Sequence, residues 1–317
     1  MAQGAKTMTE DPLHSWNGAD DPASLASWVS ARLAAAQGDI DKITAVTGAH
    51  TVENTLRPFD DAQNELAIAG NESYLMYMVG DTAPMRDAGQ AMSSKVSSAA
   101  TDLSLNQKVY KALAAVPLPE HDGATKHYLE RTLLEYRLAG VDKDDATRAK
   151  IRHLQDKITG YGLDFDRNIA NDVRKVTVTK EEMAGLPADY IARHKPTAEG
   201  TYILTTDAPD SQPVFSFAKS AKLRREMYLA YTDVAYPKNK QVLLDMLAAR
   251  EDLAHELGYQ TYADFATADQ MIGSAKNVKE LLNQLEVASE EPAKKEYAEL
   301  LAFAQAKDPG LENISLS

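Results

Sequence analysis

Apolar side chains recur every three or four residues along most of this chain, which is the spacing of amphipathic α-helices. Asp21 and Pro22 provide an N-cap and a first-turn proline for the first run, and we expect Gly38 to end it. Gly70 is the expected end of the second run. The pattern predicts four helices in the first half of the chain, over residues 22–38, 52–70, 105–115 and 124–139.

The clearest helical run begins at Asp142 and predicts one long, core-facing helix. Aliphatic and aromatic stripes of this kind usually build hydrophobic cores, so we assign this one a structural role. Its apolar positions are Ile151, Leu154, Ile158, Tyr161, Phe165 and Ile169.

Between residues 173 and 217 the pattern changes to alternation with many β-branched side chains. Residues 174–179 and 201–206 are predicted as strands. Thr179 and Glu182 have the spacing of a capping box, which predicts a short helix after the first strand. Helical periodicity resumes after Pro213. The fold class is therefore mainly α, a multi-helix domain with a small β insertion around residues 173–217.

Two more helices are predicted near the end of the chain. Gly258 follows an apolar stripe that starts at Leu243 and is a suitable C′ residue. Ser274 is expected to cap the next helix, which continues past Pro292, either with a break there or without one. We expect residues 1–20 to form a flexible amino-terminal segment and residues 21–317 to form the helical domain.

Composition excludes several classes of function. The 317 residues carry a formal net charge of −13, whereas binding to nucleic acid or an anionic membrane needs a surplus of Lys and Arg. The absence of cysteine excludes disulfides, thiolate nucleophiles and cysteine-ligated metals. The chain has no apolar run of bilayer-spanning length and no signal-peptide pattern. We favour the cytoplasm, while a periplasmic or secreted location stays open if a signal peptide was removed.

A zinc peptidase site on a helix needs the sequence His-Glu-x-x-His, which presents two imidazoles to the metal and a glutamate to its bound water. The closest match is His255-Glu256, but Tyr259 occupies the second histidine position. Gly258 is also expected to end the helix. We therefore predict a helix terminus and no zinc site at this position.

Other partial motifs are equally incomplete. Ser216 and Lys219 have Ser-x-x-Lys spacing, but the accompanying Ser-Asp-Asn and Lys-Thr-Gly motifs are missing. Gly160 and Gly162 start like a dinucleotide-binding fingerprint without its third glycine or preceding strand. The remaining histidines form no i, i+4 pair, and the acidic clusters are typical of solvated helix faces. We predict no catalytic, cofactor-binding or metal-binding residue; the histidines considered are His14, His50, His121, His127, His153 and His194.

Several short motifs occur in a fixed order between about residues 50 and 265. Together they resemble the amino-terminal half of the thimet oligopeptidase and oligopeptidase A family. The motifs are Thr51–Leu56, Glu135–Val141, Gly185-Leu186-Pro187, Tyr202, Asp207 with Pro209, Pro213-Val214, Leu223–Tyr228, and Asn239 followed by Arg250–Asp264.

The resemblance implies a helical wall of a peptide-binding channel in a zinc metallopeptidase that cleaves short peptides. In that family the zinc ligands are the two histidines of His-Glu-x-x-His and a later glutamate, all in the carboxy-terminal half. This sequence lacks that motif, so we expect a chain truncated before the zinc-binding region and inactive alone, with zinc only in the parent enzyme. Its expected partners are short peptides and the missing catalytic half.

A helical scaffold that binds peptides or a protein partner without catalysis is the alternative. If the chain is truncated, the cut should expose apolar surface and favour self-association of the fragment. The side chains expected at this surface are Leu281, Leu282, Leu285, Leu300 and Leu301.

Overall fold

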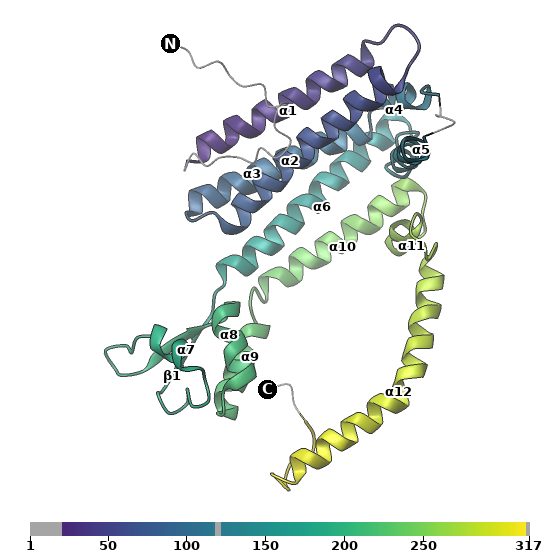
Figure 1. Cartoon of the computed structure of the whole chain (residues 1–317). Helices are drawn as coiled ribbons and strands as arrows, with labels where there is room; N and C mark the ends of the chain where they lie inside the picture. Colours follow the sequence, from purple (N-terminus) through teal and green to yellow (C-terminus); the bar gives the residue numbers. More distant parts are fainter. Residues whose placement is uncertain (1–20, 118–121, 315–317) are drawn as a thin grey trace, which may run out of the picture. The chain divides into compact units, whose positions relative to one another are not determined.

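A computed structural model describes residues 21–117 and 122–314 and divides the chain into two compact units (Figure 1). Among these residues, unit 1 takes those up to 164 together with 244–260. Unit 2 takes residues 165–243 together with those from 261 onward. The expected flexible segment 1–20 lies outside the described residues. The fold is mainly helical, as the sequence predicts.

Unit 1 is built from helices alone among its described residues. Its elements are α1 (Pro22–Thr44), the π-helix η2 (Val52–Leu56), α2 (Arg57–Val79), α3 (Ala83–Ser104), α4 (Gln107–Ala114), α5 (Gly123–Leu138), the start of α6 (Asp145–Asn171) and the end of α10 (Lys238–Leu257). Helices α1, α2 and α3 lie side by side (Figure 1). The core of the unit, to which α4 and α5 also contribute, contains Leu25, Val29, Ile43, Phe59, Leu113 and Leu129.

The expected ends of the first two helices at Gly38 and Gly70 are wrong. Helix α1 continues to Thr44 because its apolar stripe continues past Gly38 to the fully buried Ile43. One glycine in a helix costs only about 1 kcal/mol, which burial of such a side chain outweighs. Helix α2 continues to Val79 for the same reason, with Tyr77 buried beyond Gly70.

The sequence reading missed helix α3 because the segment is rich in Ala and Ser and has few large apolar side chains. Its buried positions include Met85, Val96 and Leu103. Gly89 faces α2 so closely that an added Cβ would lie 2.3 Å from the backbone nitrogen of Tyr77. Small side chains therefore let α2 and α3 approach one another.

The long helix predicted from Asp142 begins at Asp145, as α6. The side chain of Asp144 caps it by accepting from the Thr147 backbone N–H at 3.0 Å. The predicted core-facing stripe is only partly confirmed, since Ile151 is fully buried whereas Ile169 is 44% exposed.

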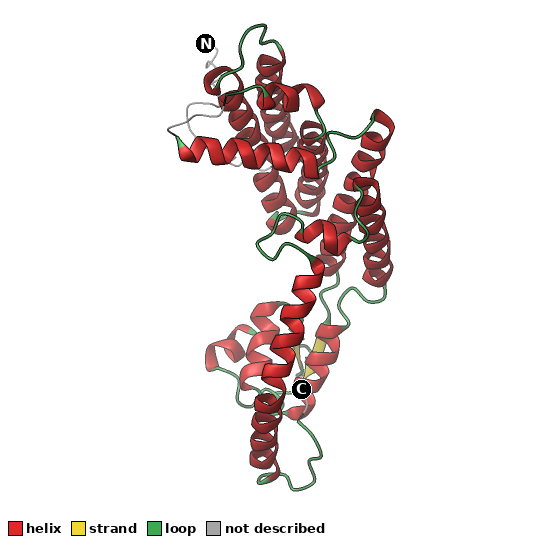
Figure 2. Cartoon of the chain, turned by 90° about the vertical axis from the view of Figure 1, so that its right-hand side faces the viewer, coloured by secondary structure: helices red, strands yellow, loops and turns green. Residues whose placement is uncertain are grey.

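Unit 2 contains the predicted β insertion. Strands β1 (Lys175–Val178) and β2 (Tyr202–Thr205) pair antiparallel, with Val176 opposite Leu204. Figure 2 shows these strands among the surrounding helices. The core around these strands includes Val178, Met183, Leu204, Val214, Leu223 and Met227. The remaining helices of the unit are α7 (Ala188–Arg193), α8 (Ala208–Phe217), α9 (Ala221–Thr232), α11 (Tyr262–Thr267) and α12 (Ala275–Gln305).

Three local predictions in this part of the chain have different outcomes. The capping box of Thr179 and Glu182 forms, with the Thr179 N–H donating to Glu182 Oε2 at 2.9 Å, but turns follow it instead of a helix. Ser274 caps α12 as expected, accepting from the Asn277 N–H at 3.1 Å. At Pro292, where the sequence leaves either a break or a continuous helix open, α12 is continuous.

Within the described part of the chain, no helix has the length and apolarity needed to cross a membrane.

Candidate functional site

The segment that most resembles a zinc motif, His255-Glu256, forms the end of a helix in the structure. Helix α10 ends at Leu257, and Gly258 adopts a left-handed φ of 95°. The Tyr259 N–H then bonds the carbonyl of Ala254 at 2.8 Å, which closes the helix in the manner of a glycine C′ cap. His255 Nε2 lies 3.0 Å from the carbonyl oxygen of Gln260. This geometry does not fit a zinc ligand pair.

The other partial motifs are also structural. Gly160 and Gly162 lie inside α6, where no phosphate-binding loop exists. Ser216 is exposed in the last turn of α8. The backbone N–H of Lys219 bonds the carbonyl of Ala184 at 2.9 Å, so the segment after α8 is tied to the turns that follow β1. Within the described ranges, no group of three or more His, Asp or Glu side chains could hold a metal ion.

Motif glycines that carry the family resemblance occupy tight turns. Gly140 has a φ of 91°, and an added Cβ would lie 2.7 Å from Ile151 Cδ1. Gly185 has a φ of 95°, and an added Cβ would lie 2.4 Å from the carbonyl oxygen of Phe217. Since only glycine adopts such positive φ values without strain, these residues fix the path of the backbone.

Polar motif residues also hold the backbone. Thr51 and Asn54 form a reciprocal capping box at the start of η2, which leads directly into α2. In unit 2, the buried Asn239 donates to the carbonyl of Phe165 at 2.9 Å and accepts from Asn168 Nδ2 at 2.8 Å. These contacts position helices, and none of them presents a reactive group.

A cleft with a volume of about 550 Å³ lies in unit 1. It forms where α3 ends, α4 begins and α6 begins, so residues far apart in the sequence meet there. Its lining is mostly polar and carries both signs of charge. The lining residues are Asp102, Leu105, Asn106, Gln107, Lys108, Asp145, Arg148, Ala149 and Arg152.

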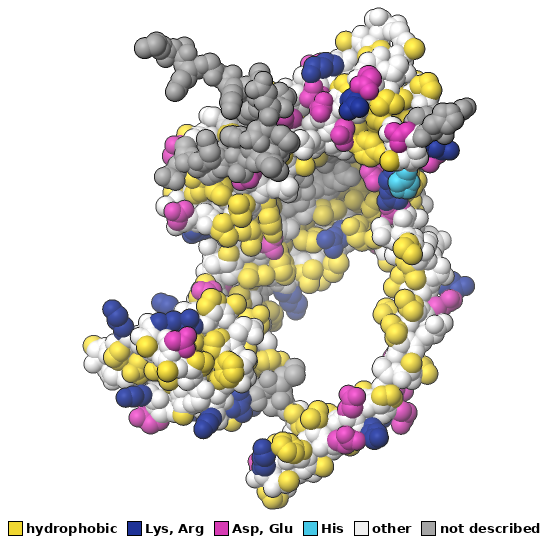
Figure 3. Space-filling view, viewed as in Figure 1, with side chains coloured by type: hydrophobic (Ala, Val, Ile, Leu, Met, Phe, Trp, Pro, Cys, Tyr) yellow, Lys and Arg dark blue, Asp and Glu magenta, His cyan; other side chains and the backbone are white. Residues whose placement is uncertain are grey.

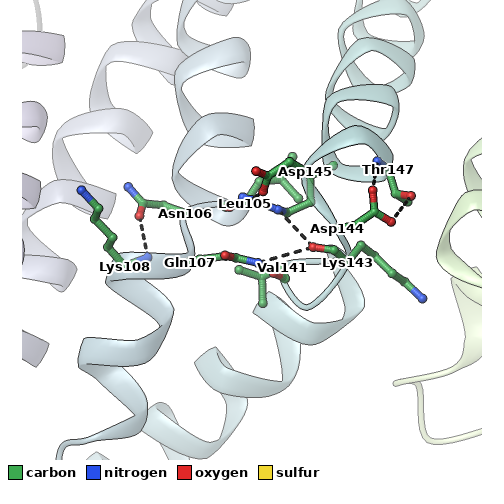
Figure 4. Close-up of polar contacts among 10 residues, drawn as sticks. Leu105, Asn106, Gln107, Lys108, Val141, Lys143, Asp144, Asp145 and Thr147 are labelled. Atoms are coloured by element: carbon green, nitrogen blue, oxygen red, sulfur yellow. Dashed lines mark hydrogen bonds and ion pairs between the residues drawn. The ribbon is translucent and has the colours of Figure 1, made fainter.

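Arg148 and Gln107 hold the floor of this cleft together. Arg148 donates to the carbonyls of Lys143 at 3.2 Å and Leu105 at 3.0 Å, and it also bonds the carboxylate of Asp145. Gln107 Nε2 donates to the carbonyl of Val141 at 3.0 Å. Figure 4 shows these contacts joining the start of α4 to the turn before α6. The cleft is therefore fixed in shape by hydrogen bonds to the backbone.

A second arginine joins α6 to α3. Arg152 Nε contacts Asp102 Oδ1, and its Nη2 donates to Asp102 Oδ2 at 3.0 Å and to Ser98 Oγ at 3.1 Å. The hydrogen bond and charge of Asp102 raise the pKa of Arg152. The lining contains no histidine or cysteine, so the arrangement suits binding of a charged ligand better than acid–base or nucleophilic chemistry.

The sequence reading did not identify this cleft. Its lining residues form no motif, and they come from segments separated by up to 50 residues. The one local signal was Asn106, whose side chain caps α4 by accepting from the backbone N–H groups of Lys108 and Val109. Helix-cap signals indicate where a helix begins but not which helices meet.

Comparisons with known proteins agree with the resemblance. The model of peptidase family M3 matches residues 214–316. Saccharolysin of Saccharomyces cerevisiae is 30% identical over 247 residues, which cover 74% of this chain and 35% of that protein. Oligopeptidase A of Escherichia coli is 24% identical over 305 residues, which cover 90% of this chain and 45% of that protein.

The chain thus spans less than half the length of either of these curated relatives. Probable thimet oligopeptidase of Arabidopsis thaliana is 24% identical over 203 residues, covering 64% of this chain and 28% of that protein. The matches extend over the helices and the β insertion alike. The chain accordingly belongs to the thimet oligopeptidase and oligopeptidase A group of peptidase family M3.

Proposed function

We propose that this chain is the non-catalytic portion of a zinc metallo-oligopeptidase that hydrolyses short peptides, and that it forms one wall of the substrate channel. One observation carries the proposal: 90% of the chain aligns with oligopeptidase A, yet the sequence contains no His-Glu-x-x-His. A segment that aligns with such a peptidase but lacks this motif would contribute to the structure of the enzyme and not to its zinc ligands.

The roles of the shared motif residues support this assignment. Gly140, Gly185 and Gly258 all have positive φ values at turns. Asn239 and the Thr51 capping box position helices. Residues that set backbone geometry, without a nucleophile or general base beside them, are expected in a supporting domain.

Zinc and the catalytic groups belong, in this proposal, to a part of the enzyme outside this sequence. There the metal would activate water for attack on a peptide bond. Short peptides and that catalytic portion are the proposed partners of the chain.

Helix α12 offers a surface for the catalytic portion. It packs against α11, and none of its residues is buried. Figure 3 shows hydrophobic side chains gathered along it. An exposed apolar surface of this kind usually marks an interface. Its large apolar side chains with more than a third of their surface exposed are Leu281, Leu282, Leu285, Val287, Tyr297, Leu300 and Phe303.

A quenched fluorescent peptide assay on the 317-residue chain tests the absence of catalysis. We expect no turnover that a chelator inhibits. Chelator-sensitive turnover that copurifies with the chain, and is absent from a mock preparation, would contradict the proposal.

Reading the coding sequence beyond Ser317 tests the rest. We expect an open frame that continues into His-Glu-x-x-His. A stop codon at that point would favour the alternative, a helical scaffold that binds peptides or a partner without catalysis, or an enzyme divided between two chains.

A further inference from the structure

A second, smaller cavity in unit 1 shares Asp102 and Asn106 with the cleft between α3, α4 and α6. It has a volume of about 120 Å³. Aliphatic side chains of α1, α2 and α3 form much of its remaining lining. These remaining residues are Leu33, Ala36, Gln37, Ile40, Leu66, Ala99 and Leu103.

We propose that the cleft and the small cavity form one binding site for a carboxylate next to an aliphatic side chain, either a free amino acid, whose ammonium the cleft also accepts, or the carboxyl end of a peptide. This inference goes beyond the proposed function, because the site lies in unit 1 and needs neither zinc nor a catalytic partner. The two shared residues place a charged region next to an apolar one. A ligand that matches both regions must combine charge with a short aliphatic group.

Two groups in the cleft can bind a carboxylate. Lys108 Nζ has no hydrogen-bond or ion-pair partner among residues 21–117 and 122–314. Asn106 uses its Oδ1 to cap α4, which leaves the hydrogens of Nδ2 available. Figure 4 shows both side chains extending to the same side of the start of α4. Hydrogen bonds from a charged donor to a carboxylate are about twice as strong as neutral ones.

Acceptors for an ammonium group line the same cleft. Gln107 donates through Nε2 to the carbonyl of Val141, and this hydrogen bond fixes the orientation of its side-chain amide. The amide oxygen Oε1 is then left as an acceptor. The carboxylates of Asp102 and Asp145 add negative charge. Asp102 also accepts from Arg152, and Asp145 from Arg148, so a bound ammonium would share each carboxylate with a guanidinium.

The small cavity can receive the aliphatic side chain of the ligand. Its volume of about 120 Å³ suits one branched aliphatic group. An aromatic side chain would not fit unless the lining side chains moved. Leu33, Leu66 and Leu103 supply apolar surface, and burial of such a group strengthens binding by roughly tenfold to a hundredfold. Leucine should therefore bind more tightly than glycine.

Isothermal titration calorimetry with leucine at millimolar concentration tests the site on the full chain. We expect saturable binding of leucine, and weaker binding of glycine by about tenfold or more. Lys108→Gln should weaken leucine binding about tenfold, because it removes a charged hydrogen bond. Lys111→Gln is the matched control on the same helix, since Lys111 is exposed and does not line the cleft. It should leave the affinity unchanged.

A second variant fills the small cavity. Ala99→Leu should reduce the affinity for leucine to that for glycine and leave glycine binding unchanged, with circular dichroism confirming the fold. Lack of saturable leucine binding, or equal affinity in wild type and Lys108→Gln, would overturn the proposal.

Two leucine derivatives distinguish the sources of the ligand. N-acetyl-leucine keeps the carboxylate and represents the carboxyl end of a peptide, whereas leucinamide keeps only the ammonium. Loss of binding with both identifies a free amino acid, and retention with N-acetyl-leucine alone identifies a peptide carboxyl end. Leucinamide that binds as tightly as leucine would refute the role given to Lys108.

Discussion

Arg32 Nη1 donates a 2.8 Å hydrogen bond to Glu65 Oε2 between α1 and α2, with the two side chains only 1% and 6% exposed. The guanidinium of Arg32 also lies 4.8 Å from the centre of the Trp28 ring. Neither charge has access to water that could replace its partner. The opposite charges of Arg32 and Glu65 therefore compensate one another inside unit 1.

Removal of one member of this pair should destabilise unit 1 strongly. We expect Glu65→Leu to lower the free energy of unfolding by about 3–5 kcal/mol, because it removes the carboxylate that compensates the buried Arg32 charge. The double variant Arg32→Met with Glu65→Leu should recover most of this loss. Urea denaturation followed by circular dichroism measures both.

Arg57→Gln is the control, since the Arg57–Glu53 pair is 67% and 73% exposed. It should leave the urea midpoint unchanged. If Glu65→Leu left the urea midpoint unchanged as the control does, the buried pair would make no measurable contribution to the stability of unit 1.

Two glycines in neighbouring helices should respond oppositely to alanine. At Gly89 the new Cβ would lie 2.3 Å from the Tyr77 backbone, so we expect Gly89→Ala to force α2 and α3 apart and to destabilise unit 1 severely. At Gly38 no atom lies within 4 Å of the new Cβ, and Gly38→Ala should stabilise α1 by about 0.5–1 kcal/mol. Thermal unfolding of the two variants beside wild type measures the difference. Equal effects would show that the α2–α3 approach is not tight.

Two buried tyrosines differ in the partners of their hydroxyl groups. The Tyr136 hydroxyl has no hydrogen-bond partner among the described residues, whereas the Tyr77 hydroxyl donates to the carbonyl of Leu163. Tyr136→Phe removes an unsatisfied polar group and should stabilise the protein by about 1 kcal/mol, while Tyr77→Phe should destabilise it by a similar amount. Denaturant unfolding at neutral pH compares them. A loss of stability in Tyr136→Phe would indicate a partner for that hydroxyl.

Tyr136 should also make the protein sensitive to alkaline pH. Burial raises the pKa of Tyr136 above its ordinary value of about 10. As the pH rises past about 10, the unfolded chain loses this proton first, so the folded state loses stability progressively toward the folded-state pKa. The free energy of unfolding should fall above pH 10 in wild type and fall less steeply in Tyr136→Phe. Identical slopes would show that other groups control the alkaline transition.

The helical fold was predictable to the extent that large apolar side chains marked it. Runs such as that around Ile151 identified α6, and β-branched residues identified β1. Helix α3 escaped because its packing uses Gly89 and small side chains, which carry no hydrophobic signal. Helix ends at glycine were misplaced where the buried stripe continued, as at Gly38. Gly258 was placed correctly because there the backbone takes a positive φ.

The cleft could not be predicted from the sequence. Sequence patterns indicate local structure, whereas the cleft depends on how α3, α4 and α6 pack against one another. Arg152 and Asp102 belong to α6 and α3, and only the packed structure brings them into contact. Conversely, the partial zinc motif at His255 was recognisable as a helix terminus from Gly258 alone. A glycine C′ cap depends only on residues within one helical turn, so a local sequence pattern is sufficient to predict it.

The isolated chain should not bind zinc stoichiometrically. His255 lies 3.0 Å from a backbone carbonyl, and Tyr259 occupies the position of a second histidine. Metal analysis after dialysis of wild type and His255→Ala should give the same low zinc content. One tightly held zinc per chain, lost in His255→Ala, would contradict our interpretation of this turn.

The apolar surface of α12 leads to the last prediction, which concerns self-association. Leu282, Leu285 and Leu300 are 58%, 56% and 60% exposed. Leu281 is also exposed at 44%, whereas Leu301 is only partly exposed. An exposed apolar patch above a few hundred Å² tends to find a partner. We therefore expect the chain to self-associate with increasing concentration, or to exchange amide hydrogens rapidly after residue 270.

Light scattering and hydrogen exchange test this, with Leu282→Gln and Leu285→Gln combined to remove the patch. Both side chains are exposed, so the double variant should keep its fold and scatter as a monomer. Lys276→Gln and Lys279→Gln combined make the control on the polar side of the same helix, and should associate as wild type does. A wild-type chain that stays monomeric, with strong protection through residue 305, would show that α12 needs no partner. That result would favour the scaffold over the peptidase portion. An apolar surface that normally packs against a catalytic partner should associate or exchange rapidly when that partner is absent.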